Sequence, residues 1–305
     1  MRDRFVAKFL SEEAFMRSKR LGRLIRASTF SLSVFMVASP VASSPPEMMK
    51  LYQVKSGDLS LNKAFLTANI DFGKIIKVPV AMYIIEHPRG LVLYDTGNAD
   101  DISDGKCEAY WGAALCSGLQ PSQTRDDVID RWLSKFGYSV DQVTHVIYSH
   151  FHLDHAGNIE MFPDAKHVVQ KEELKTAWWP EKWQAGAFVM KDYDETREFD
   201  FMQLRGDFDL FGDGAIVILD TKGHTQGHQS LLVRLPKTGS LILAGDAVYT
   251  PENENGAMPG ITWNVFESME SINRLKRIRD AEGGDLWFSH NMEQYDTHNH
   301  DQPYE

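Results

Sequence analysis

The segment SHFHLDHAGN, residues 149–158, concentrates three histidines and one aspartate directly after an apolar run. His150 and His152 lie two residues apart at a predicted strand end, where extended backbone points both side chains the same way. The turn that follows can bring Asp154 and His155 to a neighbouring position. These four groups are too many for one simple zinc site and too few for two, because each zinc takes three or four ligands. The fold must therefore bring further ligands from distant parts of the chain.

Three other predicted strand ends offer such ligands. His224 lies in DTKGHTQGH, Asp246 ends LILAGD, and His290 ends LWFSH, and each follows an apolar run. Side chains at strand ends gather on one edge of a sheet, where loops display catalytic groups on a rigid scaffold. We therefore expect these three residues to lie beside the 149–158 segment.

The remaining histidines are expected to have no part in the site. An isolated histidine is more often a surface or hydrogen-bonded core residue than a ligand. This interpretation applies to His87, His145, His167 and His228. The polar tail DTHNHDQPYE predicts that His298 and His300 are solvated.

Short β-rich runs alternate with helical patterns along the rest of the chain. Segments 80–87 and 91–97 predict a hairpin joined by PRG, and further strands are expected at 143–150, 215–221, 229–235, 240–246 and 285–290. Helices are expected at 126–137, 171–179 and 267–278. Two of them place apolar residues on one face, namely Val128, Trp132, Leu133 and Phe136 in the first and Met269, Ile272, Leu275 and Ile278 in the last. Mixed strands and helices in both halves predict an α/β sandwich in one domain.

The first 45 residues differ in composition from the remainder. A basic cluster at 17–26, an apolar stretch at 27–38 and small residues in SPVASS follow the order of a secretion signal. We expect removal of residues 1–43, with cleavage near Ala42 to Ser44, and export to the periplasm or beyond. The basic cluster lies late for such a signal, so Met16 is the expected start and residues 1–15 a start-site artefact. An uncleaved anchor or a disordered tail is the alternative.

Charge excludes one class of partner. The whole chain has a formal net charge of −11, and residues 1–43 contain 8 Lys/Arg and 3 Asp/Glu, so the mature chain keeps 24 basic and 40 acidic side chains. A surface this negative repels phosphate backbones, which argues against nucleic acid. No run reaches the ~20 apolar residues of a membrane-spanning helix, so no membrane association is expected of the mature form.

Cys107 and Cys116 are the chain's two cysteines. In an oxidising periplasm the pair could close a loop as a disulfide, whereas in the cytosol both would be ordinary small side chains. Their spacing is not that of a metal finger.

Residues 49–295 resemble the metallo-β-lactamase superfamily and, within it, the N-acyl-homoserine lactonases. The resemblance rests on SHFHLDHAGN, GHTQGHQS, GDAVYTPEN and SHNMEQ in the family's order, and on a tyrosine three positions after Asp246. It implies an αββα sandwich over residues 44–305 and a dinuclear metal site. By motif, one metal is held by His150, His152 and His224, the other by Asp154, His155 and His290, and Asp246 bridges them.

The resemblance implies a hydrolase that opens the ring of N-acyl-homoserine lactones, which is the chemistry of quorum quenching. A hydroxide shared by two divalent ions would attack the lactone carbonyl. Zinc is the leading cofactor expectation, with cobalt, iron and manganese as alternatives. Tyr249 is expected to donate a hydrogen bond to the developing oxyanion, and Asp154 to return a proton to the leaving alkoxide.

Several alternatives remain open from the sequence. A glyoxalase II-like thioesterase, a periplasmic β-lactamase or another lactonase shares much of the motif set, and a non-catalytic metal-binding module is the alternative from another class. The insertion AWWPEKWQAGAFVM, residues 177–190, either lines a groove or lid for an acyl chain or packs against the body. Acyl-chain length and oligomeric state, a homodimer included, do not follow from the sequence.

Overall fold

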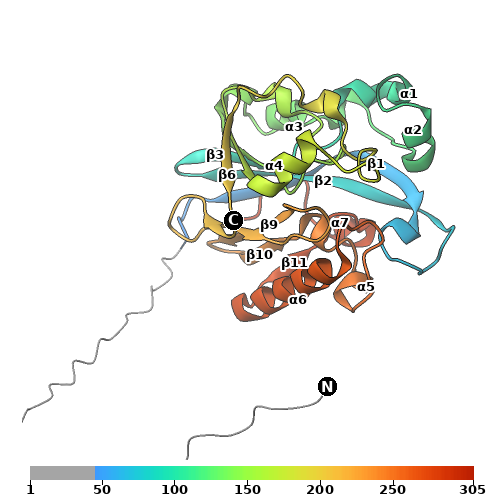
Figure 1. Cartoon of the computed structure of the whole chain (residues 1–305). Coiled ribbons are helices and arrows are strands. Elements are labelled where there is room, and N and C mark those ends of the chain that lie inside the picture. Colours follow the sequence, from blue (N-terminus) through green and yellow to red (C-terminus); the bar gives the residue numbers. More distant parts are fainter. Residues whose placement is uncertain (1–44) are drawn as a thin grey trace, which may run out of the picture. The chain divides into compact units, whose positions relative to one another are not determined.

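Two β-sheets lie face to face, and helices cover the outer face of each sheet (Figure 1). The computed structural model describes residues 45–305, so the predicted secretion signal at 1–43 lies outside the described residues. The described part falls within one compact unit. The predicted αββα sandwich in a single domain is therefore confirmed.

The first sheet has six strands in the order β1-β2-β3-β4-β5-β6. Its first three strands pair antiparallel, and β3 to β6 then pair parallel. The strands are β1 Lys50–Asn62, β2 Ile75–His87, β3 Gly90–Tyr94, β4 Val143–Ile147, β5 Lys166–Gln170 and β6 Asp200–Leu204.

The second sheet has five strands in the order β11-β10-β9-β8-β7. β10 pairs antiparallel with β9, which pairs antiparallel with β8, so β8 and β10 run in the same direction; β11 is parallel to β10. The carboxyl ends of β8, β10 and β11 consequently share one edge of this sheet. The strands are β7 Phe208–Asp209, β8 Ile216–Asp220, β9 Gln229–Leu235, β10 Gly239–Leu243 and β11 Asp285–Trp287.

The main core lies between the sheets. Ile85, Val92 and Ile147 of the first sheet and Leu231 and Val233 of the second belong to one buried cluster. These strands carry apolar residues on successive positions because helices bury their other face too. The sequence therefore shows continuous apolar runs instead of strict alternation.

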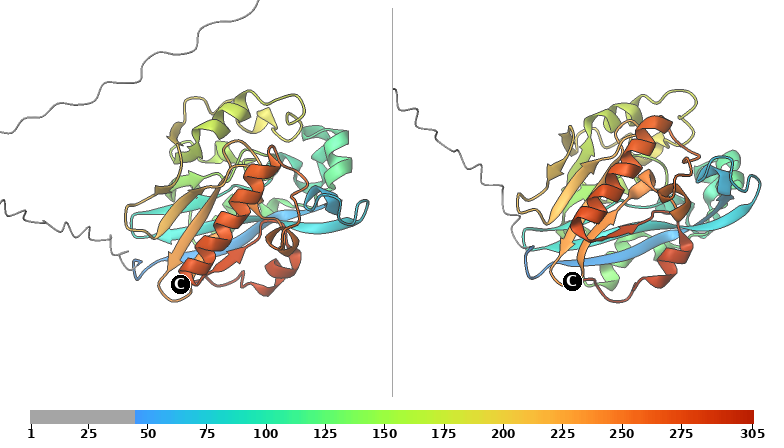
Figure 2. Two further views of the ribbon diagram at one scale, coloured as in Figure 1. Left: turned by 60° about the horizontal axis from the view of Figure 1, so that its bottom comes forward. Right: turned by 90° about the horizontal axis from the view of Figure 1, so that it is seen from below.

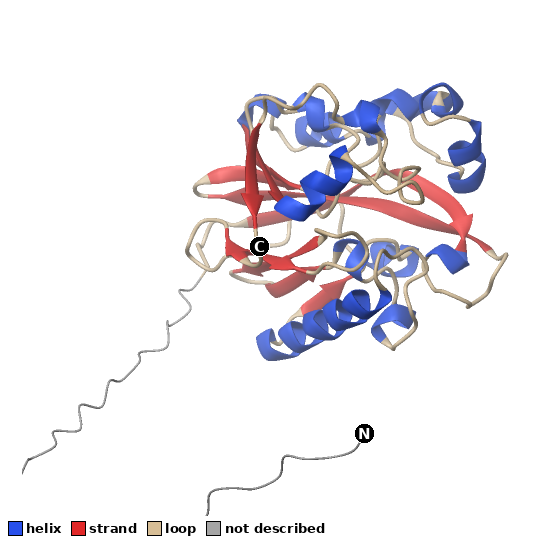
Figure 3. Cartoon of the chain, viewed as in Figure 1, coloured by secondary structure: helices blue, strands red, loops and turns tan. Residues whose placement is uncertain are grey.

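The helices are short except for α6, which lies along the outer face of the second sheet in two further views (Figure 2). Asn264 caps its first turn by accepting from Phe266 N–H and Glu267 N–H, and Gly283 ends it in the left-handed region at φ 60°. Figure 3 shows the helical layers by colour. The α-helices are α1 Cys107–Tyr110, α2 Ala113–Leu119, α3 Ile129–Lys135, α4 Lys171–Trp178, α5 Pro251–Glu254, α6 Val265–Glu282 and α7 Met292–Thr297.

The expected hairpin, the other expected strands and the three expected helices are all present; most strands end one to three residues earlier than expected, whereas β2 begins five residues earlier and β9 has the expected bounds. In α6 the predicted face is confirmed, because Ile272 and Leu275 are buried against the second sheet. Strands β1, β5, β6 and β7 were not predicted. None of the helices within residues 45–305 is long and apolar enough to span a bilayer.

Two expectations about single residues are settled by the structure. Cys107 and Cys116 form a disulfide that joins α1 to α2. The expectation that His298 and His300 are solvated is only partly met, because both are half-buried: His298 stacks on Trp287 with ring centroids 4.1 Å apart, and His300 stacks on Tyr295 at 4.0 Å. The tail folds back on the body, where Tyr304 pairs with Leu51 of β1.

Candidate metal centre

The predicted ligands lie in loops that begin where strands end. Strands β4, β10 and β11 end at Ile147, Leu243 and Trp287, each three residues before His150, Asp246 and His290, and β8 ends at Asp220, four residues before His224. The expected strand at 143–150 is therefore shorter, and His150 lies in the loop after it. Because β8, β10 and β11 are parallel, their loops meet at one edge, opposite the loop after β4.

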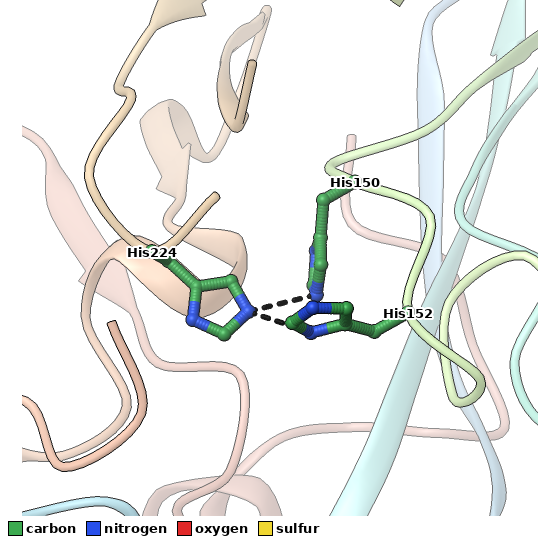
Figure 4. A group of neighbouring side chains, drawn as sticks. All are labelled: His150, His152 and His224. Carbon is green, nitrogen blue, oxygen red and sulfur yellow. Dashed lines mark hydrogen bonds between the residues drawn. The ribbon is translucent and has the colours of Figure 1, made fainter. Parts of the chain in front are cut away.

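Three histidines form the first group of this centre (Figure 4). His224 Nε2 lies 3.0 Å from His150 Nε2 and 2.9 Å from His152 Nδ1. Burial lowers the pKa of all three rings, most strongly for His150 and His152, so the rings are neutral. The ring N–H of His224 lies on Nδ1, which donates to the carbonyl oxygen of Ile261 at 3.0 Å. Nε2 therefore keeps a lone pair that can bind a metal. Three ring nitrogens thus meet at one point.

A second group lies beside the first and contains Asp154, His155 and His290. Asp154 Oδ2 is 3.6 Å from His155 Nε2 and 3.5 Å from His290 Nε2. Burial opposes charge on both rings, but Asp154 and Asp246 beside His155, and Asp246 beside His290, raise the pKa of both. Asp154 and the neighbouring Asp246 therefore favour positive charge at this place.

Asp246 lies between the two groups and presents one oxygen to each. Oδ1 is 3.4 Å from His155 Nε2 and 3.2 Å from His290 Nε2, whereas Oδ2 is 3.4 Å from His224 Nε2 and 3.7 Å from His150 Nε2. Burial alone would raise the pKa of Asp246, but His290 and His155 hold it well below its usual range. An ionised carboxylate at this place can contact two cations at once.

The chemistry of these residues fits a pair of divalent cations. Asp246 Oδ1 and His155 Nε2 are buried and have no hydrogen-bond partner within residues 45–305. A buried polar atom without a partner costs free energy, so both atoms call for a further group. Imidazole nitrogens and carboxylate oxygens are the donors that zinc and its neighbours bind. All seven residues predicted as ligands are thus brought together by the fold.

Sequence reasoning missed Asp95, which supports the second group. Asp95 Oδ2 lies 2.8 Å from His155 Nδ1, and its Oδ1 accepts from Ser149 N–H at 2.6 Å. Asp95 belongs to LVLYDTG, which was interpreted only as the second strand of a hairpin. Asp95 directly follows an apolar strand, as the predicted ligands do, and this position could have indicated that it lies near the site. His290 is held similarly, with Nδ1 2.8 Å from the carbonyl oxygen of Pro79.

His228 is a hydrogen-bonded core residue, as expected. Its Nε2 accepts from the backbone N–H of Asp246 at 2.9 Å, and its Nδ1 lies 2.9 Å from Thr221 Oγ1. Burial lowers the pKa of His228 to about 3, so the ring stays neutral and can accept. This bond holds the turn that carries Asp246. The other three isolated histidines, His87, His145 and His167, also have hydrogen-bond partners outside the centre.

Tyr249 is buried beside the first group, and its hydroxyl faces His224. The oxygen lies 2.8 Å from His224 Nδ1 and donates to the carbonyl oxygen of Ile261 at 3.0 Å. The sequence did not predict these contacts. The hydroxyl and the Ile261 carbonyl together orient the His224 ring, while the Tyr249 side chain also borders the pocket described next.

An apolar pocket of about 210 Å³ opens onto the metal ligands. Its lining combines His152, Asp154, His224, Asp246 and His290 with a wall of leucines and other apolar side chains, namely Leu59, Leu61, Phe65, Leu66, Leu115, Leu119, Leu153, Ala187, Tyr249 and Ile261. Of the larger cavities on the surface of residues 45–305, one of about 460 Å³ borders His290, and the others contain none of these ligands. The centre is thus accessible from one side through an apolar passage.

The insertion at 177–190 meets the site at its end only. Ala187 lines the pocket and accepts a hydrogen bond from Leu153 N–H at 3.0 Å, and the Phe188 ring lies 4.7 Å from the His152 ring. Trp179 and Trp183 are 90% and 61% exposed. Both predicted alternatives therefore occur at the end of the insertion, where Ala187 lines the pocket and Phe188 packs against the body. The exposed side chains of Trp179 and Trp183 follow neither alternative.

Comparison with known proteins supports the same family as the motifs. Residues 75–290 match the family model of the metallo-beta-lactamase superfamily. An N-acyl homoserine lactonase, AttM, from Azorhizobium caulinodans is 32% identical over 246 residues, which are 79% of this chain and 93% of that protein. The AttM protein of Rhizobium radiobacter is 33% identical over 232 residues, 75% of this chain and 88% of that protein.

A solved structure shares the fold. An N-acyl homoserine lactone hydrolase with the product N-hexanoyl-L-homoserine bound at its catalytic metal centre has a TM-score of 0.73 and 28% sequence identity to this chain. The similarity covers 82% of this chain and 96% of that one. From the αββα sandwich, the seven converging ligands and these matches, we conclude that this chain belongs to the metallo-beta-lactamase superfamily, with N-acyl homoserine lactonases among its relatives.

Proposed function

We propose that this protein hydrolyses the lactone ring of N-acyl-homoserine lactones with two divalent metal ions. The observation that carries the proposal is the apolar pocket that ends on the ligand set. A polar, reactive ring attached to an apolar acyl chain matches a pocket with metal ligands at its base and leucines along its wall. The relatives that act on these lactones support the same substrate class.

The arrangement of donor side chains supports two cation positions. His150, His152 and His224 would hold one ion, Asp154, His155 and His290 the other, and Asp246 would bridge them. When bound, such ions polarise a carbonyl and supply a hydroxide nucleophile at neutral pH. Zinc is our leading candidate, and cobalt, iron or manganese suits the same donors.

The chain's own side chains complete the reaction. Hydrolysis breaks the ring C–O bond and adds one water, so that an oxygen bonds to the carbonyl carbon and a proton reaches the departing ring oxygen. Asp154 borders the pocket, where its carboxylate can accept a proton from the attacking water and pass it to that oxygen. Tyr249 borders it too, and its hydroxyl can donate to the oxyanion if it leaves the Ile261 carbonyl.

The test is a comparison of substrate classes on one metal-quantified sample of the mature protein. We expect hydrolysis of acyl-homoserine lactones, with far lower rates on a β-lactam and a glutathione thioester. His152→Ala should lose activity, and His145→Ala, which alters a histidine outside the centre, should keep it. A protein that binds two metals but prefers the thioester or the β-lactam would refute the lactonase proposal.

We also propose that the protein works in the periplasm or outside the cell. The disulfide between Cys107 and Cys116 supports this location, because disulfides persist in oxidising compartments. The order of basic, apolar and small residues at 17–44 supports it independently.

A further inference from the structure

Glu173 is a fully buried carboxylate on the third residue of α4. Its Oε1 accepts from the backbone N–H of Phe151 at 2.9 Å, and its Oε2 accepts from the backbone N–H of Gly227 at 3.1 Å. Phe151 lies between His150 and His152, and Gly227 follows His224 by three residues. One side chain thus joins the two loops that carry the first group of ligands.

The two loops come from different sheets, and no strand pairing among residues 45–305 joins them at Phe151 and Gly227, although Gln229 N–H donates to the Ser149 carbonyl oxygen at 2.9 Å two residues away. The first loop follows β4 of the six-stranded sheet, and the second connects β8 to β9 of the five-stranded sheet. Backbone N–H groups in such buried loops need an acceptor. A carboxylate with two oxygens satisfies one donor from each loop, which an amide or an apolar side chain cannot do.

Gly227 gives independent evidence of close docking. A Cβ atom at this position would lie 2.2 Å from the backbone nitrogen of Glu173 and 2.7 Å from its Cα. The backbone of the second loop therefore approaches the backbone of α4 more closely than any residue with a side chain permits. The loop is seated on α4 as well as bonded to its carboxylate.

We propose that Glu173 is a positioning residue that clamps the His150–His152 loop to the His224 loop before metal binds. The clamp sets the approach of His224 Nε2, which lies within 3.0 Å of a ring nitrogen of His150 and of His152. It acts through backbone bonds and touches neither metal nor substrate. The inference rests on the proposed function only in taking these histidines as metal ligands.

The variant Glu173→Gln tests the clamp, since its amide has one acceptor oxygen where the carboxylate has two. Removal of groups that orient metal ligands typically weakens metal binding ~10- to 100-fold, and we expect zinc affinity of the metal-free protein, measured at pH 8 by chelator competition, to fall in that range. Asp192→Asn is the matched control: Asp192 is equally buried, but its carboxylate accepts from Tyr110. It should stay within about threefold of wild type. Unchanged zinc affinity in Glu173→Gln, or an equal loss in Asp192→Asn, would overturn the proposal.

A second measurement needs no variant and no activity. In metal-free wild-type protein, the amides of Phe151 and Gly227 should exchange with solvent at least about 100-fold more slowly than in an unfolded chain, because both donate to a buried carboxylate. Exchange of either amide at the unprotected rate would show that no clamp exists before metal binds, even if Glu173→Gln fails to fold. If wild type binds no metal yet protects both amides, the proposed function fails while the clamp stands.

Discussion

Breaking the disulfide between Cys107 and Cys116 should lower stability by a calculable amount. The bond joins two short helices, of four and seven residues, that are too short to be stable alone. Both cysteines are buried in a cluster with Leu59, Leu61 and Tyr249. Reduction leaves this packing in place and removes only the constraint on the unfolded chain.

The magnitude follows from the loop length. The cysteines are nine positions apart, which closes a loop of about ten residues and predicts a loss of about 2.7 kcal/mol on reduction, through the chain entropy of the unfolded state. For a domain of this size 1 kcal/mol corresponds to about 2 °C in Tm, so the melting temperature should fall by about 5 °C.

The assay is thermal unfolding of the protein with and without reductant. The protein is metal-free, so that the reductant cannot change the melting temperature by removing bound metal. A Cys107→Ala/Cys116→Ala variant controls for the reductant itself and should show no further change when it is added. A shift below about 1 °C would refute the loop-entropy argument. A loss of far-ultraviolet helical signal at 25 °C on reduction would refute the assumption that packing alone holds α1 and α2.

Four further outcomes are expected. Asp246→Asn should lose metal and activity together, because a neutral amide bridges two cations poorly, and full metal occupancy with full activity would contradict the dinuclear assignment. Tyr249→Phe should keep two metals and lose roughly 10- to 100-fold in kcat, about 1.4–2.7 kcal/mol; metal loss would instead make its contact with His224 structural. His167 is buried, and burial lowers its pKa to about 4. Between about pH 6.5 and 4 the unfolded chain therefore binds more protons than the folded chain, so the free energy of unfolding should fall as pH falls through that window. A flat dependence of this free energy on pH, measured by urea unfolding, would contradict the prediction. N-terminal sequencing of protein from a secreting host should begin near Ser43 to Pro46, and a chain retaining Met1 or Met16 would refute export with cleavage.

The sequence by itself determined the candidate ligands and the layers. Each of the seven predicted ligands follows an apolar run, and such runs are visible because the sheets are buried on both faces. The helical period of α6 identified the side that packs on the second sheet, since periodicity is a local property of the chain. The sequence could not decide whether Cys107 and Cys116 form a disulfide, because its formation depends on the distance between them and on the compartment as well as on their spacing in the sequence.

Only the tertiary structure decided which groups support the ligands. Asp95 contacts His155 from 60 positions away, and Glu173 reaches Gly227 from 54 positions away. No local pattern marks such pairs, because their contact depends on how two sheets and a helix pack. The same reason explains why His298 and His300 are less solvated than expected: a polar tail predicts solvation, yet these half-buried rings stack on Trp287 and Tyr295 where the chain folds back. Residue type and spacing indicate what a segment can bind. Which side chains contact that segment depends on the packing of segments that are distant in the sequence.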